Sequence, residues 1–178
     1  ELINKHIGST RFLYNLSLET KQSAYAGYGI NLSCFTLHNQ LTDLKKECPW
    51  LKEINSQSMQ QAITDLDSAY TRFFKGQACF PKYKIKNKGK QSFRVPQNVI
   101  VDQENCKLII PKFKRGINIT LHREIKGNIK QATISKTPTG KYFASILVET
   151  DESTPNKKQV TKETSIGIDL GIKDFIVT

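Results

Sequence analysis

Apolar residues recur at helical spacing through the first part of the chain. Two runs step by four and three positions, which places their side chains on one stripe of an α-helix. The first run is Leu37, Leu41, Leu44 and Cys48, and the second is Met59, Ile63, Leu66, Tyr70 and Phe73. These stripes predict two helices that pack on each other.

The ends of these helices carry start and stop signals. Residues that can cap a helix stand before each run, Ser33 or Thr36 before the first and Ser56 or Ser58 before the second. Pro49 and Gly76 follow the two runs and end them. Residues 2–25 also show a helical pattern, which Gly27 and Gly29 interrupt. We therefore expect an N-terminal helical bundle.

From about residue 92 the period of the pattern changes to two, which is typical of half-buried strands. The alternation is clearest at 117–122 and 142–149. Shorter candidate strands lie at 93–95, 99–101, 108–110 and 129–136, with a hairpin turn at 137–140. Short strands at this spacing predict a small antiparallel β-barrel or a strongly twisted antiparallel sheet. Residues 150–164 are polar and indicate a linker, after which 165–178 begin a new pair of strands.

Charge narrows the choice of partner. The chain has 178 residues, with 27 Lys and Arg against 16 Asp and Glu, a net charge of +11. Residues 1–71 carry 6 basic and 7 acidic side chains, whereas residues 72–148 carry 17 and 3. Such an excess favours a polyanion, either a nucleic acid or an anionic membrane surface. No apolar run approaches the ~18 residues that span a bilayer, so we expect no transmembrane segment and no membrane partner.

The densest positive charge lies between Asp67 and Asp102, where the sequence contains no acidic residue. Five lysines between 82 and 90 alternate with other residues. In an extended chain they lie on one side at intervals of about 6.6 Å, close to the phosphate repeat of an extended nucleic-acid strand. Aromatic residues are interleaved with them and can stack on bases. The alternative is a solvated lysine loop with no ligand.

Taken with the basic residues of 112–115, this pattern gives a set of candidate nucleic-acid-binding residues. They are Arg72, Lys75, Lys82, Tyr83, Lys84, Lys86, Lys88, Lys90, Phe93, Arg94, Lys112, Lys114 and Arg115.

The four cysteines and three histidines show no metal-binding or catalytic spacing. Cys34, Cys48, Cys79 and Cys106 form no C-x-x-C pair. We expect reduced thiols and a cytoplasmic location.

A single acidic residue stands out near the end of the chain. Asp169 ends an apolar strand and is followed by Gly171, which allows close approach of the backbone. A carboxylate in this place can hold Mg²⁺ or a metal-bound phosphate. The alternative is an aspartate that caps a tight turn.

Several motifs occur in an order that strongly resembles the TnpB/OrfB family of insertion-sequence transposons, which is similar to the type V CRISPR effectors. The motifs are GSTRFLYN (8–15), FPKYK (80–84), SFR (92–94), IIPK (109–112), GNIK (127–130), GKYF (140–143) and GIDLGIK (167–173). The likeness spans nearly the whole chain.

The resemblance implies an α+β fold in three parts. Residues 1–75 would form a helical recognition domain, 76–160 a wedge-like β-barrel that binds nucleic acid, and 161–178 the first strands of a RuvC nuclease domain with an RNase H-like fold. Family members are RNA-guided DNA endonucleases that bind a guide RNA and target DNA and use Mg²⁺. Asp169 matches the first catalytic aspartate, which would hold Mg²⁺.

This sequence departs from the family pattern at its ends. The later catalytic Glu and Asp and the Cys-rich insert do not occur, so we expect no cleavage by this chain alone. Cutting of target DNA by the purified chain with guide and Mg²⁺ would contradict this. The strands at 165–178 need hydrogen-bond partners, which could be each other, the barrel, or a second copy of the chain.

Two other functions fit parts of the pattern. A stand-alone, non-catalytic nucleic-acid-binding or regulatory protein of a transposon would show the same basic β-rich segment. An actin-like or sugar-kinase-like ATPase also ends its first strand in Asp-x-Gly, but it then needs hydroxyl residues. Ile172 and Lys173 stand there instead.

Overall fold

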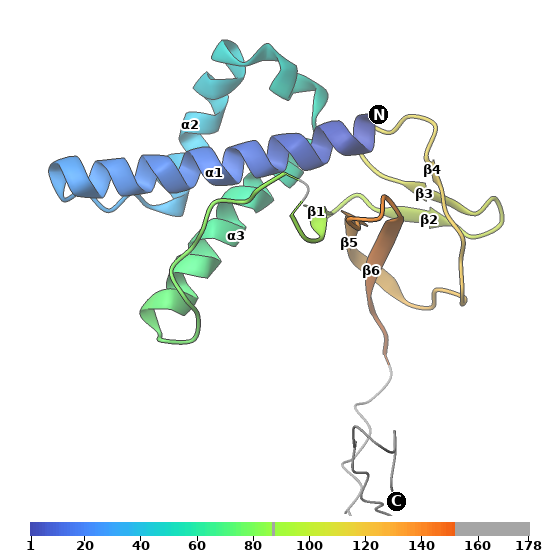
Figure 1. Ribbon diagram of the computed structural model, residues 1–178. Coiled ribbons are helices and arrows are strands. Elements are labelled where there is room, and N and C mark those ends of the chain that lie inside the picture. Colours follow the sequence, from blue (N-terminus) through green and yellow to red (C-terminus); the bar gives the residue numbers. More distant parts are fainter. Residues whose placement is uncertain (87, 152–178) are drawn as a thin grey trace, which may run out of the picture.

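The computed structural model of the chain describes residues 1–86 and 88–151. The fold is α+β, with the helices first and two small antiparallel sheets after them (Figure 1). The helical elements are α1 (Leu2–Tyr28), α2 (Cys34–Glu47), the 3-10 helix η1 (Pro49–Glu53) and α3 (Ser56–Phe74). The strands are β1 (Gln91–Val95), β2 (Ile100–Asp102), β3 (Lys107–Ile109), β4 (Ile117–Asn118), β5 (Asn128–Lys136) and β6 (Tyr142–Glu149).

The capping residues of the helices agree with the sequence prediction at α2 and differ from it at α1 and α3. The Ser33 hydroxyl accepts from the Thr36 N–H at 3.1 Å and caps α2, as predicted. Asn55, rather than a serine, caps α3. Helix α1 runs through Gly27 and ends at Gly29, whose φ of 65° suits a left-handed C-cap.

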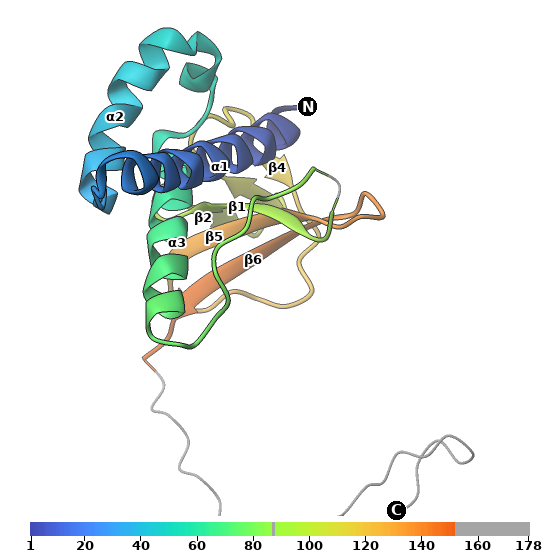
Figure 2. The same cartoon turned by 60° about the vertical axis from the view of Figure 1, so that its left-hand side comes forward.

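The long helix α1 crosses both other helices (Figure 2). Leu13 of α1 packs with Leu41 of α2 and Met59 of α3 in one buried cluster. Farther along α1, Leu18 packs with Leu66 of α3 in a second cluster. The predicted stripes on α2 and α3 do face each other, but α1 supplies part of both cores.

The β-strands form two separate three-stranded sheets, with orders β1-β5-β6 and β2-β3-β4. Every pairing is antiparallel, and Phe93 of β1 lies opposite Ile134 of β5. The predicted closed barrel is wrong for the part of the chain described. Strands β2, β3 and β4 are only two or three residues long and pair only among themselves, so no ladder joins the two sheets.

Apolar side chains fill the space between the two sheets. Val95 and Ile134 come from the first sheet and Leu108 from the second, and all three are buried. Ile7 of α1 completes this cluster, so the first turns of the helix belong to the β core. Where β5 begins, Gly127 has a φ of 106°, and a Cβ there would collide with the Glu149 carbonyl of β6.

His6 joins the helical and β parts of the molecule. Its side chain is fully buried, and its Nδ1–H donates to the Leu2 carbonyl at 2.9 Å. Its Nε2 accepts from the N–H of the α3 cap Asn55 at 3.1 Å. The ring lies 4.9 Å from the Phe93 ring and 5.0 Å from the Phe113 ring. Burial lowers the pKa of His6, so the ring is neutral and donates from one nitrogen only.

The chain after α3 turns back and docks along α1. Asn15 of α1 donates to the Lys84 carbonyl at 2.9 Å and accepts from the Lys84 N–H at 2.8 Å, so the side-chain amide acts like a strand partner. The Tyr83 hydroxyl donates to Gln22 of α1 at 3.2 Å. The Lys84 ammonium lies 4.0 Å from the centre of the Tyr14 ring. We call residues 82–90 the basic segment. These contacts hold its first residues against α1.

The buried His6 predicts a pH-dependent stability. The unfolded chain binds a proton near the ordinary histidine pKa of 6.5, whereas the folded chain resists protonation. The free energy of unfolding should therefore fall as the pH drops below about 6.5, by at most about 1.4 kcal/mol per pH unit. Urea unfolding at several pH values measures this. His6→Gln should remove this contribution, while His122→Gln, at an exposed site, should not; an unchanged profile in His6→Gln would refute the assignment.

The two hydrogen bonds between the Asn15 side chain and the Lys84 backbone, called the Asn15 clamp, hold the basic segment against α1. We predict that their loss releases this segment locally. Asn15→Ala removes both hydrogen bonds to Lys84 and should cost about 1–2 kcal/mol locally. Trypsin should then cleave within residues 82–90 faster than in the wild type, with little change in the unfolding midpoint. Asn39→Ala, at an exposed site on α2, is the control. Equal cleavage rates in the two variants would show that the clamp does not hold the segment.

Candidate nucleic-acid interface

Two adjoining hollows lie on either side of Arg11. One, of about 620 Å³, is lined by Arg11, Lys86, Lys136 and the hairpin residues 137–140. The other, of about 570 Å³, has five basic residues in its lining, namely Arg11, Lys82, Lys84, Lys88 and Lys90. Both hollows share Ile7, Arg11 and Gln91. We call the two together the basic cleft.

Arg11 is held at the centre of the basic cleft. It lies one turn after Ile7 on α1, so the buried Ile7 anchors this face of the helix. One guanidinium nitrogen donates to the side-chain oxygen of Gln91 at 2.8 Å. A guanidinium has five N–H donors in a planar fork, so this bond leaves donors for a phosphate. Arg11 is thus oriented before any ligand binds.

The charge of the basic cleft is uncompensated. No Asp or Glu is among the described residues that line either hollow. Asp65 of α3 approaches Arg94 at 3.7 Å, and neither residue lines the cleft. Clustered cations without carboxylates produce a positive potential that attracts phosphates.

One lysine of the basic segment, Lys84, lies over an aromatic ring of α1. Desolvation lowers the pKa of the Lys84 ammonium, and Arg94 acts in the same direction while Asp65 opposes it. Burial also raises the pKa of Tyr14, the ring beneath this ammonium. Lys84 therefore serves to dock the basic segment as well as to line the cleft.

The structure divides the lysines that the extended-chain hypothesis placed on one side. Lys82, Lys84, Lys88 and Lys90 line one hollow, whereas Lys86 lines the other. The backbone turns between them, since the Lys88 N–H points to the Ile85 carbonyl at 3.4 Å and Gly89 has a φ of 70°. A turn of this kind interrupts the alternation of an extended strand.

Two of the predicted residues have structural roles. Phe93 is only 3% exposed and packs in the β core, so its ring is not on a surface where bases could stack. Lys112 donates to the Lys52 carbonyl at 2.9 Å, which satisfies the end of η1. This contact ties the β3–β4 loop to the helical part.

The remaining predicted residues lie outside the lining of the basic cleft. Lys114 and Arg115 are exposed in the β3–β4 loop. Arg72 and Lys75 are exposed at the end of α3. Tyr83, in contrast, lines the cleft and is 48% exposed.

The predicted metal residue, Asp169, lies outside the described residues, as do the strands predicted at 161–178. Within residues 1–86 and 88–151, no three His, Cys, Asp or Glu side chains gather closely enough to hold a metal ion. None of the described helices combines the length and the apolar composition that a membrane span requires.

Sequence reasoning missed Arg11 and Lys136 as members of this site. Arg11 follows Ile7 by four positions, so the helical period places a cation beside a core residue, which was the available signal. Lys136 ends β5 directly before the hairpin turn, and its ammonium approaches Asn4 of α1 at 3.3 Å. Only the tertiary fold brings these two residues to the basic segment.

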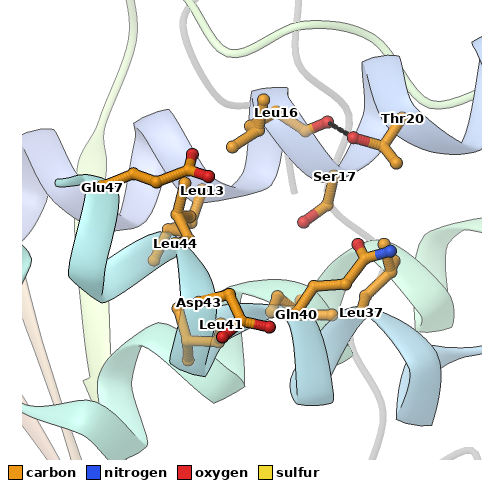
Figure 3. A pocket seen from close by; sticks show the side chains of 11 residues that line it. Leu13, Leu16, Ser17, Thr20, Leu37, Gln40, Leu41, Asp43, Leu44 and Glu47 are labelled. Atoms are coloured by element: carbon orange, nitrogen blue, oxygen red, sulfur yellow. Dashed lines mark hydrogen bonds between the residues drawn. The ribbon is translucent and has the colours of Figure 1, made fainter.

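A smaller hollow of about 240 Å³ between α1 and α2 has a different character (Figure 3). Its lining combines leucines of both helices with Asp43 and Glu47. The Thr20 hydroxyl donates to the Leu16 carbonyl at 2.8 Å on its α1 side. Because acidic and no basic side chains line it, this hollow does not suit an anionic ligand.

Comparison with known proteins finds relatives along nearly the whole chain. No family model matches. Two curated proteins carry names that begin "Putative RNA-guided DNA endonuclease": InsQ of Escherichia coli (strain K12), 31% identical over 96% of this chain, and a protein of Streptomyces pristinaespiralis, 28% identical over 98%. The virulence protein VsdF of Salmonella dublin is 34% identical over 49% of this chain and 82% of its own length.

The chain spans about two fifths of the length of the two endonuclease-named relatives, 41% and 43%. Similarity at this level over almost all of the present sequence agrees with the ordered motifs described above. These matches confirm the resemblance of the chain to the TnpB/OrfB family.

Proposed function

We propose that this chain is the nucleic-acid-binding portion of an RNA-guided DNA endonuclease, with a guide RNA and target DNA as its partners, acting in the cytoplasm. The observation that carries the proposal is the basic cleft, in which cations from α1, the basic segment and β5 converge without a lining carboxylate. The names of the two relatives that match nearly the whole chain support it.

The chemistry of the cleft suits a phosphate backbone rather than a small molecule. Arg11 offers a planar fork that can pair with two phosphate oxygens, and the surrounding lysines act as point charges. Two hollows that share one arginine can take consecutive phosphates of a single strand. Contacts of this type fix the register of the strand and carry no sequence information.

In the complete enzyme, we propose that Asp169 contributes one ligand to Mg²⁺, which would activate water and stabilise the leaving oxygen. One carboxylate holds Mg²⁺ weakly, so the site needs further acidic residues. The part of this chain that the structure describes would bind and orient the nucleic acid, and it would not supply the metal site.

Charge reversal in the basic cleft tests the proposal. We expect Lys82→Glu, Lys88→Glu and Lys90→Glu together to weaken binding of a labelled single-stranded RNA and to flatten its salt dependence. The slope of log K against log salt should fall by about 2, since each lost phosphate contact on a single strand removes about 0.7. Fluorescence anisotropy over a salt series measures both quantities.

A matched control changes the net charge equally at other sites. Lys46→Glu, Lys52→Glu and Lys126→Glu together replace three exposed lysines that do not line the cleft. We expect a smaller loss of affinity and an unchanged slope. Equal effects of the two triple variants would mean that net charge alone, and not the cleft, attracts RNA. Sequencing of RNA that co-purifies with the full chain then tests for a defined guide.

A further inference from the structure

Four aromatic rings form a closed group where α3 ends and the chain turns back. Phe74 stacks on Tyr70 with centroids 6.1 Å apart, and Tyr70 meets Phe80 edge-on at 5.5 Å. Phe73 completes the group, 5.2 Å from both Phe74 and Phe80. We call these four residues the aromatic platform.

A backbone turn builds the platform. The Gly76 N–H donates to the Phe73 carbonyl and the Gln77 N–H to the Arg72 carbonyl, both at 2.9 Å, and Gly76 has a φ of 68°. This left-handed helix end reverses the chain and returns Phe80 onto α3. The Lys21 ammonium lies 5.2 Å from the Tyr70 ring and holds it from the α1 side. The rings are therefore ordered before any ligand arrives.

The platform nevertheless exposes a large aromatic surface to water. Phe74 is 74% exposed and Phe80 is 42% exposed. A group that only closed the end of α3 would gain by covering these rings, since burial of apolar surface is favourable. An aromatic face that is fixed and left uncovered is suited to contact another molecule.

The charges around the platform indicate which molecule. Arg72 and Lys75 flank Phe73 and Phe74 and are exposed. Asp67, the preceding acidic residue, lies 3.8 Å from the Lys21 ammonium, so part of its charge is compensated. An apolar protein partner would have to desolvate the flanking cations, whereas a nucleic acid brings phosphates to meet them.

We propose that the aromatic platform stacks an unpaired nucleobase of a single strand, with the Phe74 ring as the contacting face and Arg72 and Lys75 beside the neighbouring phosphates. The proposal rests on the proposed function, which supplies the nucleic acid. Bases within a duplex already stack on their neighbours, so a single aromatic face selects a base that is splayed out of a strand.

The test pairs removal of the ring with removal of the base. The ligands are labelled 12-nucleotide single strands of uridylate, and of thymidylate for the DNA arm, each with a matched strand in which every nucleotide is abasic. We expect Phe74→Ala in the full chain to weaken binding of the base-bearing strand about tenfold. On the abasic strand, wild type and Phe74→Ala should bind equally. The salt slope should not change, because no phosphate contact is lost. The arm with the larger loss identifies RNA or DNA as the source of the base.

Phe35→Ala is the matched control, because Phe35 is 73% exposed on α2 and takes no part in the platform. It should leave affinity for every strand within twofold of wild type. Phe74→Trp keeps a stacking face, so it should retain affinity, and its emission should be quenched by the base-bearing strand alone.

Four results would overturn the proposal. Equal affinity of wild type and Phe74→Ala for the base-bearing strand would reject stacking while leaving salt-dependent binding, and so the proposed function, intact. An equal loss on the abasic strand would assign Phe74 a folding role. A change in oligomeric state with Phe74→Ala, and none in strand affinity, would assign the platform to protein contact. Absence of salt-dependent binding by wild type would overturn the proposed function as well.

Discussion

The buried, neutral ring of His6 is the contact on which the arrangement of the two halves depends. It bonds through both nitrogens, to the first turn of α1 and to the cap of α3, and it lies between aromatic rings of β1 and the β3–β4 loop. A protonated ring would lose its acceptor, leave the Asn55 N–H without that partner, and bury a charge. The helical and β parts therefore share one core, and this fixes the first turns of α1 against the sheets.

That fixed geometry explains how a cationic site can exist on a small molecule. Like charges brought together repel each other, and the folded scaffold must offset this repulsion. Here Arg11 is held by Gln91 and the neighbouring Ile7 is buried in the core, while Asn15 clamps the backbone of the basic segment. The cations are positioned by contacts that are themselves neutral or cation–π. The cleft thus keeps its full charge for a ligand.

Helical periodicity predicted the elements of the first half well, because the side chains of α2 and α3 that face the core recur at 3.6-residue spacing. The cap of α3 was missed because Asn55 competes with two serines, and its N–H contact to His6 is tertiary. Period-two alternation located the long strands β5 and β6, but it could not show that the short strands pair only among themselves. Phe93 and Val95 lie two positions apart on the same face of β1, and both are buried. Two apolar residues at alternate positions of a strand are typical of a buried face. Arg11 and Lys136 join the basic segment only through long-range packing.

Helix α1 also fixes the distance between the basic cleft and the aromatic platform. Arg11 of the basic cleft and Lys21, which lies over the Tyr70 ring, are ten positions apart on one uninterrupted helix. At a rise of about 1.5 Å per residue this corresponds to about 15 Å along the axis. Because a helix resists compression, the spacing between the basic cleft and the aromatic platform is set by the backbone geometry of the helix and not by a ligand. Any ligand that contacted both sites would have to adapt its own conformation to that length.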